Sequence, residues 1–279
     1  MIKKFPTQPL GLLIGRRWVK AFGSLRQKEQ FGVLKRPNYA YGLLRAADLA
    51  KYFGKKKTTV CEFGVAGGDG LLNMISLGRQ ISLETGIEFR IVGFDTGEGL
   101  PKIEGYKDHP ELWSAGDFAM QDRKMLLSRI GNRAEMIFGD IRDTINHFIT
   151  TLDETAPLGF IAIDVDIYSA TINSLQCLLG RPELYNPAVS IYFDDVTFFF
   201  ANKWCGELAA IEEFNNENKM RKIDNDRSFP GNRPSKYENW YQQMYSCHIL
   251  DHEARNVQIR KGKLSIEEHY NFMKSQFVS

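Results

Sequence analysis

Residues 60–70 read Val60-Cys61-Glu62-Phe63-Gly64-Val65-Ala66-Gly67-Gly68-Asp69-Gly70, an apolar run that ends in a cluster of glycines. Glycines at the end of a strand let the backbone pass close to a ligand, and the N-terminus of a following helix offers free N–H donors. The next apolar run, residues 91–95, ends in Asp95, an acid that suits a ribose diol at this position. The pattern predicts a strand, a tight turn and a helix that bind a nucleotide-like cofactor.

The details of the turn separate it from two common cofactor motifs. A nicotinamide or flavin turn reads G-x-G-x-x-G, but counted from Gly64 the later glycine positions hold Ala66 and Asp69. A phosphate-binding P-loop closes with Gly-Lys-Ser/Thr, whereas Leu71 and Leu72 follow here. The arrangement E-x-G-x-x-G-G-x-G resembles motif I of class I methyltransferases, and this resemblance implies S-adenosylmethionine as the cofactor. The alternative is a tight connection whose glycines serve packing only.

Length and composition indicate one ordinary globular domain. The 279 residues are 43% hydrophobic and 25% charged, enough to bury a full α/β core. We expect a class I methyltransferase domain over residues 39–279 and a basic N-terminal arm over residues 1–38. The net charge of +2 gives no general reason to expect nucleic acid as a partner. The four cysteines lack C-x-x-C spacing, so we expect no zinc site and a reducing, cytoplasmic location. No apolar run approaches the length of a transmembrane segment.

The N-terminal arm differs in charge from the rest of the chain. Residues 1–38 carry nine lysines and arginines against a single acid, Glu29. Such a segment is a solvated arm or a helix packed on a partner subunit, a membrane-surface contact, or a landing site for an acidic substrate such as a nucleotide sugar. The sequence does not decide between these interpretations. The apolar and basic character of the arm leads us to expect a homo-oligomer.

Apolar patterns alternate along the chain as in an α/β protein. Continuous apolar runs such as residues 160–163 mark strands that are buried on both faces, which is typical of a parallel sheet. We expect a Rossmann-like, mostly parallel sheet with helices on both faces, closed by a C-terminal antiparallel hairpin of residues 243–250 and 257–260. The other strands are predicted at residues 59–64, 89–95, 134–140, 159–166 and 189–195, and the helices at residues 39–53, 68–84, 118–130, 143–150, 170–179 and 207–215.

Acidic residues follow two of these predicted strands. Asp164 and Asp166 end the fourth strand, and Asp194 and Asp195 end the fifth. The carboxyl ends of parallel strands meet at one edge of a sheet, so four carboxylates converge there and repel one another unless a cation lies among them. Mg²⁺ prefers such oxygen ligands, and we therefore expect a magnesium site. The alternative is that one or two of the acids cap helices or bind arginines.

Four segments together resemble the macrocin O-methyltransferase family, which includes the sugar O-methyltransferases of macrolide and aminocoumarin antibiotic biosynthesis. They are residues 62–70, 93–101, 164–171 and 194–195, and the similarity covers roughly residues 39–215. The element D-x-D-x-Y-x-x-T followed by D-D is specific, whereas motif I marks only the superfamily. The resemblance implies that Asp164, Asp194 and Asp195 bind Mg²⁺, which grips two neighbouring sugar oxygens, one of which receives the methyl group.

The same resemblance implies the cofactor contacts. Glu62 would face the amino-acid end of S-adenosylmethionine, Asp95 the ribose, and Asp140 with Ile141 the adenine. The full set of expected cofactor-binding residues is Glu62, Gly64, Val65, Ala66, Gly67, Gly68, Gly70, Asp95, Thr96, Asp140, Ile141 and Asp164.

The expected chemistry follows from these positions. Coordination to Mg²⁺ lowers the pKa of a secondary alcohol and fixes its lone pair towards the sulfonium methyl group. Asp164 is the first candidate for accepting the proton, and His248 or His252 is the alternative base. Asp166 is expected to hold a loop backbone or a helix end near the site.

Departures from the family pattern leave the acceptor open. Gly97 stands where the family usually has an aromatic residue, and three phenylalanines, residues 198–200, follow the second pair of aspartates. These rings pack against the sheet or a subunit partner, or they line an acceptor pocket. Residues 229–241, rich in Pro, Arg, Tyr and Trp, are a candidate substrate lid.

The sequence therefore predicts a cytoplasmic, Mg²⁺-dependent O-methyltransferase that uses S-adenosylmethionine to methylate a hydroxyl of a sugar or glycosylated small molecule. This is an activity of carbohydrate or natural-product modification. Two other classes remain as alternatives. One is a metal-independent methyltransferase acting on nitrogen or on a non-sugar acceptor. The other is a non-catalytic protein of the same fold that scaffolds an assembly through its basic arm.

Overall fold

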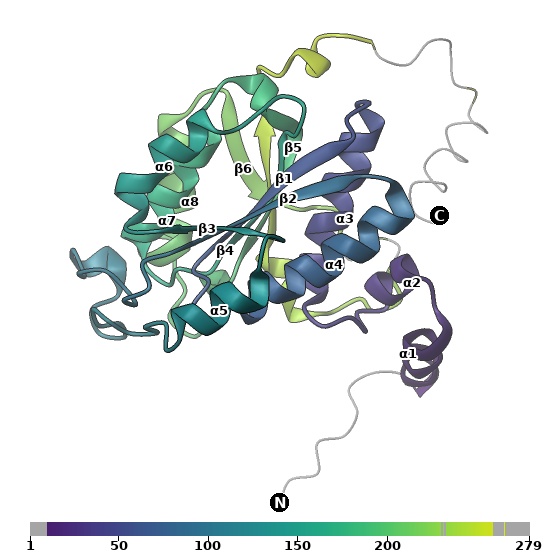
Figure 1. Ribbon diagram of the computed structural model, residues 1–279, viewed down its shortest axis with the longest axis horizontal. Coiled ribbons are helices and arrows are strands. Elements are labelled where there is room, and N and C mark those ends of the chain that lie inside the picture. The colour runs from purple at the N-terminus through teal and green to yellow at the C-terminus, as the bar shows by residue number, and fades with distance from the viewer. Residues whose placement is uncertain (1–9, 230, 232, 259–264, 266–279) are drawn as a thin grey trace, which may run out of the picture.

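The computed structural model describes residues 10–229, 231, 233–258 and 265, and its centre is one seven-stranded sheet (Figure 1). The strand order is β3-β2-β1-β4-β5-β7-β6. Strands β1 to β5 run parallel, whereas β7 is antiparallel to both β5 and β6. The strands are β1 Lys57–Phe63, β2 Glu88–Asp95, β3 Glu135–Phe138, β4 Leu158–Ile163, β5 Tyr185–Phe193, β6 Arg221–Asn225 and β7 Met244–Ile249.

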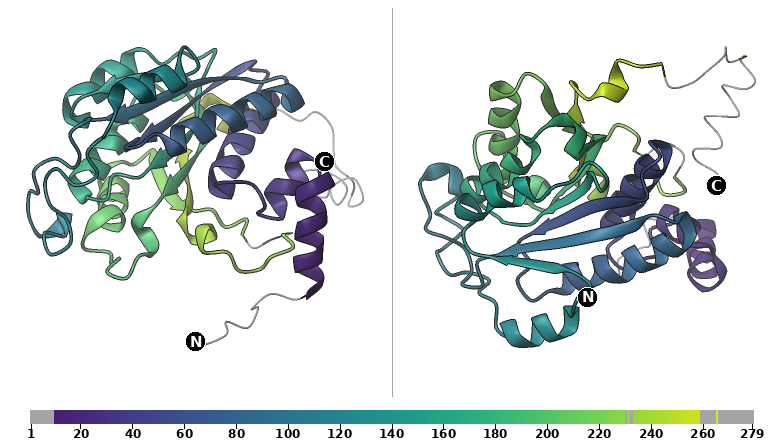
Figure 2. Two further views of the ribbon diagram at one scale, coloured as in Figure 1. Left: turned by 60° about the horizontal axis from the view of Figure 1, so that its bottom comes forward. Right: turned by 45° about the horizontal axis from the view of Figure 1, so that its top comes forward.

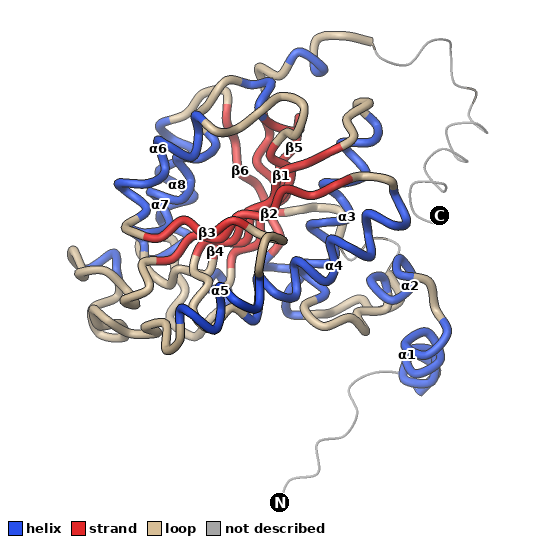
Figure 3. The backbone as a smooth tube through the Cα atoms, viewed as in Figure 1, coloured by secondary structure: helices blue, strands red, loops and turns tan. Residues whose placement is uncertain are grey.

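Helices cover both faces of this sheet, as Figure 3 shows with the strands enclosed between two layers of helix. One layer holds α3 (Pro37–Tyr52), α4 (Asp69–Thr85) and α5 (Arg123–Ile130). The other holds α6 (Ile141–Thr150), α7 (Tyr168–Leu175) and α8 (Gly206–Glu217). Two further helices, α1 (Leu10–Phe22) and α2 (Leu25–Gln30), lie beside the first layer, with α1 at the edge of the molecule (Figure 2).

The central strands are buried on both faces, which explains their continuous apolar runs. Every residue of β4 is buried, and so are the last six residues of β1. Phe63 stacks on Phe94 with ring centroids 4.4 Å apart, so β1 and β2 are joined by side chains as well as by backbone hydrogen bonds. On the opposite face α3 approaches β4 closely, because a side chain at Gly42 would collide with the ring of Phe160.

The expected Rossmann-like architecture is confirmed, with its mostly parallel sheet, helices on both faces and antiparallel C-terminal strands. The expected pairing of residues 243–250 with residues 257–260 is wrong. Strand β7 matches the first predicted strand, but it pairs with β6, which precedes it in the chain. Val257 lies outside the sheet, and residues 259 and 260 are outside the described residues. Strand β6 escaped prediction because its sequence, Arg-Lys-Ile-Asp-Asn, has a single apolar residue, Ile223.

Helix boundaries shift by a few residues where local capping decides them. The helix expected to begin at Phe118 begins at Arg123, because the Asp122 side chain accepts a hydrogen bond from the Met125 N–H and caps it.

No described helix is both long and apolar enough to cross a membrane. Three of the cysteines are buried, Cys205 is half-buried at the start of α8, and none of the four forms a disulfide.

Candidate active site at the carboxyl edge of the sheet

The glycine-rich turn follows β1 and packs directly against the end of β4. Gly64 has a φ of +85°, in the left-handed region, and an added Cβ there would collide with the backbone oxygen of Asp164. Gly70, in the first turn of α4, has a similar role, since a Cβ would collide with the carboxylate of Glu62. These two glycines bring the turn, the helix and β4 into contact.

Asp95 ties the glycine turn to the loop after β2. Its Oδ2 accepts a 2.7 Å hydrogen bond from the Ala66 N–H, and its Oδ1 accepts a 2.6 Å bond from the Gly97 N–H. Ala66 has a φ of +43°, an uncommon conformation that this hydrogen bond helps to hold. A carboxylate offers about four acceptor positions, so Asp95 can still accept from a ligand diol while it holds both loops.

Glu62 lies buried beneath α4 with one oxygen satisfied and one without a partner. Its Oε1 accepts a 2.6 Å hydrogen bond from the Tyr39 hydroxyl, while Oε2 has no hydrogen-bond partner among the described residues. Burial raises the pKa of Glu62 to about 8, against the opposing effect of the Tyr39 hydrogen bond. An unpartnered oxygen at this depth is a group to which a ligand donor could bind.

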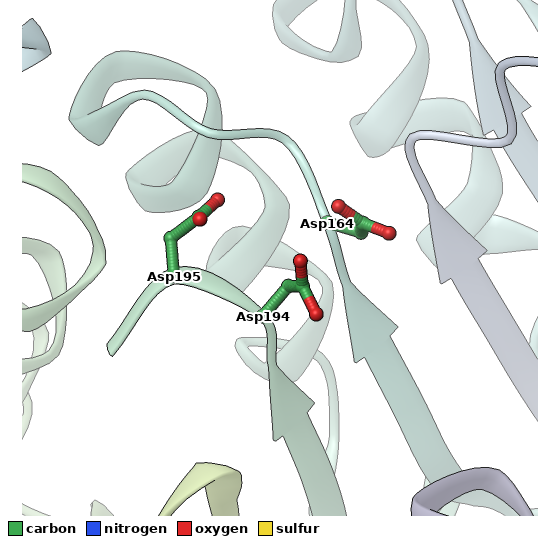
Figure 4. A group of neighbouring side chains, drawn as sticks. All are labelled: Asp164, Asp194 and Asp195. Atoms are coloured by element: carbon green, nitrogen blue, oxygen red, sulfur yellow. The ribbon is translucent and has the colours of Figure 1, made fainter. Parts of the chain in front are cut away.

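Three aspartates converge at the ends of β4 and β5 (Figure 4). Asp164 directly follows β4, and Asp194 and Asp195 directly follow β5. Each offers one oxygen, and these oxygens all lie within 4.8 Å of one another. The Tyr192 hydroxyl donates to Asp194 Oδ1, and Gln243 Nε2 donates to the Asp194 backbone oxygen over 2.6 Å. The parallel strands thus bring together the residues that the sequence predicted as metal ligands.

The electrostatics of this cluster fit a cation. Burial, and after it the charges of Asp194 and Asp166, raise the pKa of Asp164 to about 7. Burial, followed by repulsion from Asp166 and Asp194, raises the pKa of Asp195 to about 8. Asp195 Oδ2 is buried and has no hydrogen-bond partner among the described residues. A divalent cation with hard-oxygen preference would satisfy these oxygens, so the residues present fit Mg²⁺.

One cavity of about 450 Å³ joins the glycine turn to the aspartate cluster. Its volume suits a small organic ligand. It is lined at one end by the turn and the β2 loop, and at the other by the residues after β4 and β5. The lining residues predicted from the sequence are Gly64, Ala66, Asp95, Thr96, Asp140, Ile141, Asp164, Asp194 and Asp195.

Three other expected cofactor contacts do not line this cavity. Val65 is buried among the core side chains, Gly68 precedes α4 with a φ of +85°, and Gly67 lines a neighbouring cavity. Asp140 caps α6 by accepting from the Arg142 N–H, and hydrogen bonding to the Arg142 side chain lowers the pKa of Asp140. Asp140 therefore has a structural role in addition to lining the cavity.

The histidines proposed as alternative bases lie far from the aspartates. His248 is opposite Ala188 near the start of β5, six residues before Asp194, which corresponds to about 20 Å along a strand. His252 caps a short turn by accepting from the Ala254 N–H. Because β7 runs antiparallel to β5, its C-terminal histidines are carried to the opposite edge of the sheet, and the structure contradicts a catalytic role for them in this cavity.

Asp166 differs from its expected role. Its carboxylate accepts no hydrogen bond within the described part of the chain, and it lines the cavity instead. Its φ is +61°, and the Ile167 N–H donates to the Val165 oxygen across it in a tight three-residue turn. Such strained residues gather at functional sites, and here the turn places a fourth carboxylate in the cavity, close enough to Asp194 to interact with it electrostatically.

Three further residues join the site without a sequence motif to mark them. Glu207, at the start of α8, is buried, accepts a 2.8 Å hydrogen bond from the Asp195 N–H and leaves Oε1 without a described partner. Trp113 lines the cavity with its buried indole N–H unpartnered among the described residues. Arg36 lies over the Tyr39 ring, 5.1 Å from its centroid. A general signal for Glu207 is an acid in a first helical turn, which is too common to be specific.

The segments expected to be a lid or an acceptor wall do not line this cavity. Phe199 is 93% exposed, whereas Phe198 packs against the His109 ring. Arg233 lies within the aromatic cluster of residues 229–241 and pairs with the buried Glu29 of α2. The aromatic residues that line the cavity are Phe94, Trp113 and Phe118, and the ring centroids of the last two lie 5.9 Å apart.

No known protein family matches the chain, and no curated protein sequence matches it. Solved structures do resemble it. The calicheamicin methyltransferase CalS11 is 17% identical, with a TM-score of 0.49 and coverage of 90% of this chain and 95% of that one.

Two other neighbours are O-methyltransferases. One, from Bacillus cereus and in complex with SAH, is 13% identical with a TM-score of 0.42, covering 88% of this chain and 93% of that one. The other, TomG from Streptomyces achromogenes, is involved in tomaymycin synthesis and is 13% identical, with a TM-score of 0.40 and coverage of 88% and 92%. Similarities this distant carry no conclusion about the activity of this chain.

Proposed function

We propose that this protein is an S-adenosylmethionine-dependent O-methyltransferase whose transfer step requires Mg²⁺. One observation carries the proposal. A single cavity is lined at one end by a glycine turn with a diol-binding acid, Asp95, and at the other by Asp164, Asp194 and Asp195. A sulfonium cofactor at the first end and a metal-held hydroxyl at the second would meet within this one space.

On the cofactor side, the chain supplies groups for each part of the ligand. Asp95 would accept from the ribose, and Ile141 would contact the adenine. Arg36 is a half-buried cation with no hydrogen bond or ion pair among the described residues, and it interacts electrostatically with Glu62 and Asp164. We assign the carboxylate of the cofactor to Arg36 and its ammonium group to the unpartnered oxygen of Glu62.

On the acceptor side, Asp164, Asp194 and Asp195 would hold Mg²⁺, and Asp166 stands ready as a further oxygen ligand. The metal, when bound, lowers the pKa of a coordinated hydroxyl. Asp164 lies where the two ends of the cavity meet, and its carboxylate would accept the proton that the hydroxyl loses. Tyr192 and Gln243 keep Asp194 in place through their hydrogen bonds.

The acceptor proposed is a hydroxylated small molecule, most simply a sugar or glycoside. The flat walls of Trp113 and Phe118 suit the face of a sugar ring, and the free indole N–H of Trp113 can donate to a hydroxyl oxygen. A cytoplasmic location is proposed from the four cysteines, all of which are free thiols.

The test is a thermal-shift titration with S-adenosylhomocysteine, repeated with Mg²⁺ and with EDTA, on the wild type and on Asp164→Ala. A ligand at about one hundred times its Kd stabilises a protein by about 2.7 kcal/mol, which such a titration detects readily. We expect stabilisation of the wild type by the cofactor product, and a separate Mg²⁺ effect that is lost in Asp164→Ala. Glu98→Gln, which removes an exposed carboxylate, is the matched control and should keep both effects.

Each result has a clear meaning. Cofactor binding without a Mg²⁺ effect, also in the presence of sugar nucleotides, would favour the metal-independent methyltransferase. Failure of S-adenosylhomocysteine to stabilise the wild type would overturn the proposal. Where both effects are found, transfer of a labelled methyl group to a panel of nucleotide sugars identifies the acceptor.

A further inference from the structure

Helix α1 presents its apolar side to solvent. Leu10, Ile14, Trp18 and Phe22 follow one another at a spacing of four residues and are 73%, 61%, 58% and 76% exposed. Each step of four residues advances about 40° around a helix, so these side chains form one continuous stripe. We call it the α1 stripe. The rings of Trp18 and Phe22 lie against each other, with centroids 6.0 Å apart.

The opposite side of α1 holds the helix to the protein, which fixes the direction of the stripe. Val19 is buried there. Arg16 donates a 2.8 Å hydrogen bond to the backbone oxygen of Phe31 and pairs with Glu238 at 2.6 Å. The stripe therefore faces away from the protein, at the edge of the molecule where α1 lies (Figure 2).

The charges on α1 have a single sign. The exposed residues of the helix comprise six apolar residues and two cations: Leu10, Gly11, Ile14, Arg17, Trp18, Lys20, Ala21 and Phe22. Helix α1 contains no acid. The nearest acid in the sequence, Glu29 of α2, is buried in an ion pair with Arg233. An ordinary surface helix has the reverse arrangement, with its polar residues outside.

We propose that α1 docks on an anionic lipid surface, with the α1 stripe in the interface and Arg17 and Lys20 beside the lipid phosphates. Apolar and aromatic residues on one side of a helix with cations at the margin match a helix that lies in the membrane plane. Tryptophan is favoured at this depth because one end of its ring is apolar and the other polar. The site of docking is separate from the cavity at the carboxyl edge of the sheet.

The charge pattern favours lipid over a second copy of this chain. Two copies packed stripe to stripe would place Arg17, at the margin of each stripe, near the cations of the other copy, with no acid on either helix to pair with it. An anionic surface supplies the missing negative charge to every cation at once.

The experiment is flotation of the full chain with vesicles of phosphatidylcholine alone or with phosphatidylserine as about a third of the lipid. We expect binding to the mixed vesicles that weakens with salt, and at least about tenfold weaker binding to the neutral ones. The double substitution I14D/W18D should abolish binding. R17Q/K20Q keeps the stripe and should weaken binding by about fivefold for each cation removed.

Two controls keep the test sharp. Leu83→Asp introduces an aspartate at an exposed apolar position outside the α1 stripe, on α4, and should bind like the wild type. Trp18→Phe keeps an aromatic ring and should also bind. Circular dichroism of each variant confirms that it is folded.

The proposal fails if the wild type does not float with the mixed vesicles, if it floats equally with neutral ones, or if Leu83→Asp loses as much binding as I14D/W18D. It also fails if mass measurement shows a dimer that I14D/W18D converts to a monomer, because the stripe is then an interface between copies. Loss of binding in I14D/W18D and weaker binding in R17Q/K20Q, with binding kept in Trp18→Phe and Leu83→Asp, supports it.

Discussion

The two ends of the cavity are built in opposite ways. At the glycine end, both oxygens of Asp95 already accept hydrogen bonds from backbone N–H groups. At the aspartate end, Asp164 and Asp195 are half-buried close to like charges, and Asp195 keeps an oxygen without a described partner. The contacts of Asp95 are satisfied in the folded chain, whereas the carboxylates of the aspartate cluster repel one another. The same residue type thus stabilises the fold at one end and opposes it at the other.

The largest expected effect comes from breaking the contact that joins both ends. Gly64→Ala places a Cβ against the backbone oxygen of Asp164 at a φ of +85°, so we expect a loss of stability of more than about 3 kcal/mol. Urea unfolding measures it. Gly67→Ala is the matched control, because its Cβ would meet no atom within 4 Å and should cost less than about 1 kcal/mol. Equal losses in the two variants would contradict the role of this contact.

The second prediction concerns pH. The pKa of Asp164 is raised to about 7 in the folded protein, above its value of about 3.9 in the unfolded chain. The folded state therefore binds more protons, and the stability of the metal-free protein falls as the pH rises from about 4 to about 7. We expect Asp164 alone to contribute a fall of about 2–4 kcal/mol, which Mg²⁺ should reduce.

Asp164→Asn tests the origin of that fall. Without this carboxylate, the metal-free protein should be more stable than the wild type at pH 8 by about 1–3 kcal/mol and should depend less on pH. Urea unfolding with EDTA at several pH values gives both quantities. A variant that is less stable than the wild type at pH 8 would show that the cluster is not under repulsion.

Asp95→Asn should change the stability with the opposite sign. An asparagine can accept from only one of the two N–H groups, so its NH₂ faces either Ala66 or Gly97 as a second donor. We expect a loss of about 1–3 kcal/mol. Stability measured alongside Asp164→Asn at pH 8 gives the comparison directly, and a stabilising Asp95→Asn would refute it.

Motif spacing predicted the parts of this site that the backbone order alone determines. The glycine turn, Asp95 and the three aspartates all follow parallel strands, so the sheet brings them to one edge. The prediction that His248 lies in the site is wrong, because its position depends on the direction of β7, which the sequence of that strand does not reveal.

Residues without a motif were found only in three dimensions. Glu207 approaches Asp195 because α8 begins beside the end of β5, twelve residues further along the chain. The left-handed turn at Asp166 leaves no trace in composition. Strand β6 was missed for a related reason. Its Arg221 is buried and donates to the backbone oxygens of Leu178 and Gly180, so a residue that suggests an exposed segment helps to anchor an edge strand.

The burial of the cysteines has a practical consequence for following this site in solution. Burial raises the pKa values of Cys61, Cys177 and Cys247, so these thiols are slow to form the reactive thiolate. Cys205 alone is partly accessible among the four, and it lies two residues before Glu207. Brief treatment of the native protein with a fluorescent maleimide should therefore label one position, next to the aspartate cluster. A fluorophore on Cys205 could then report cation binding without any substitution in the chain.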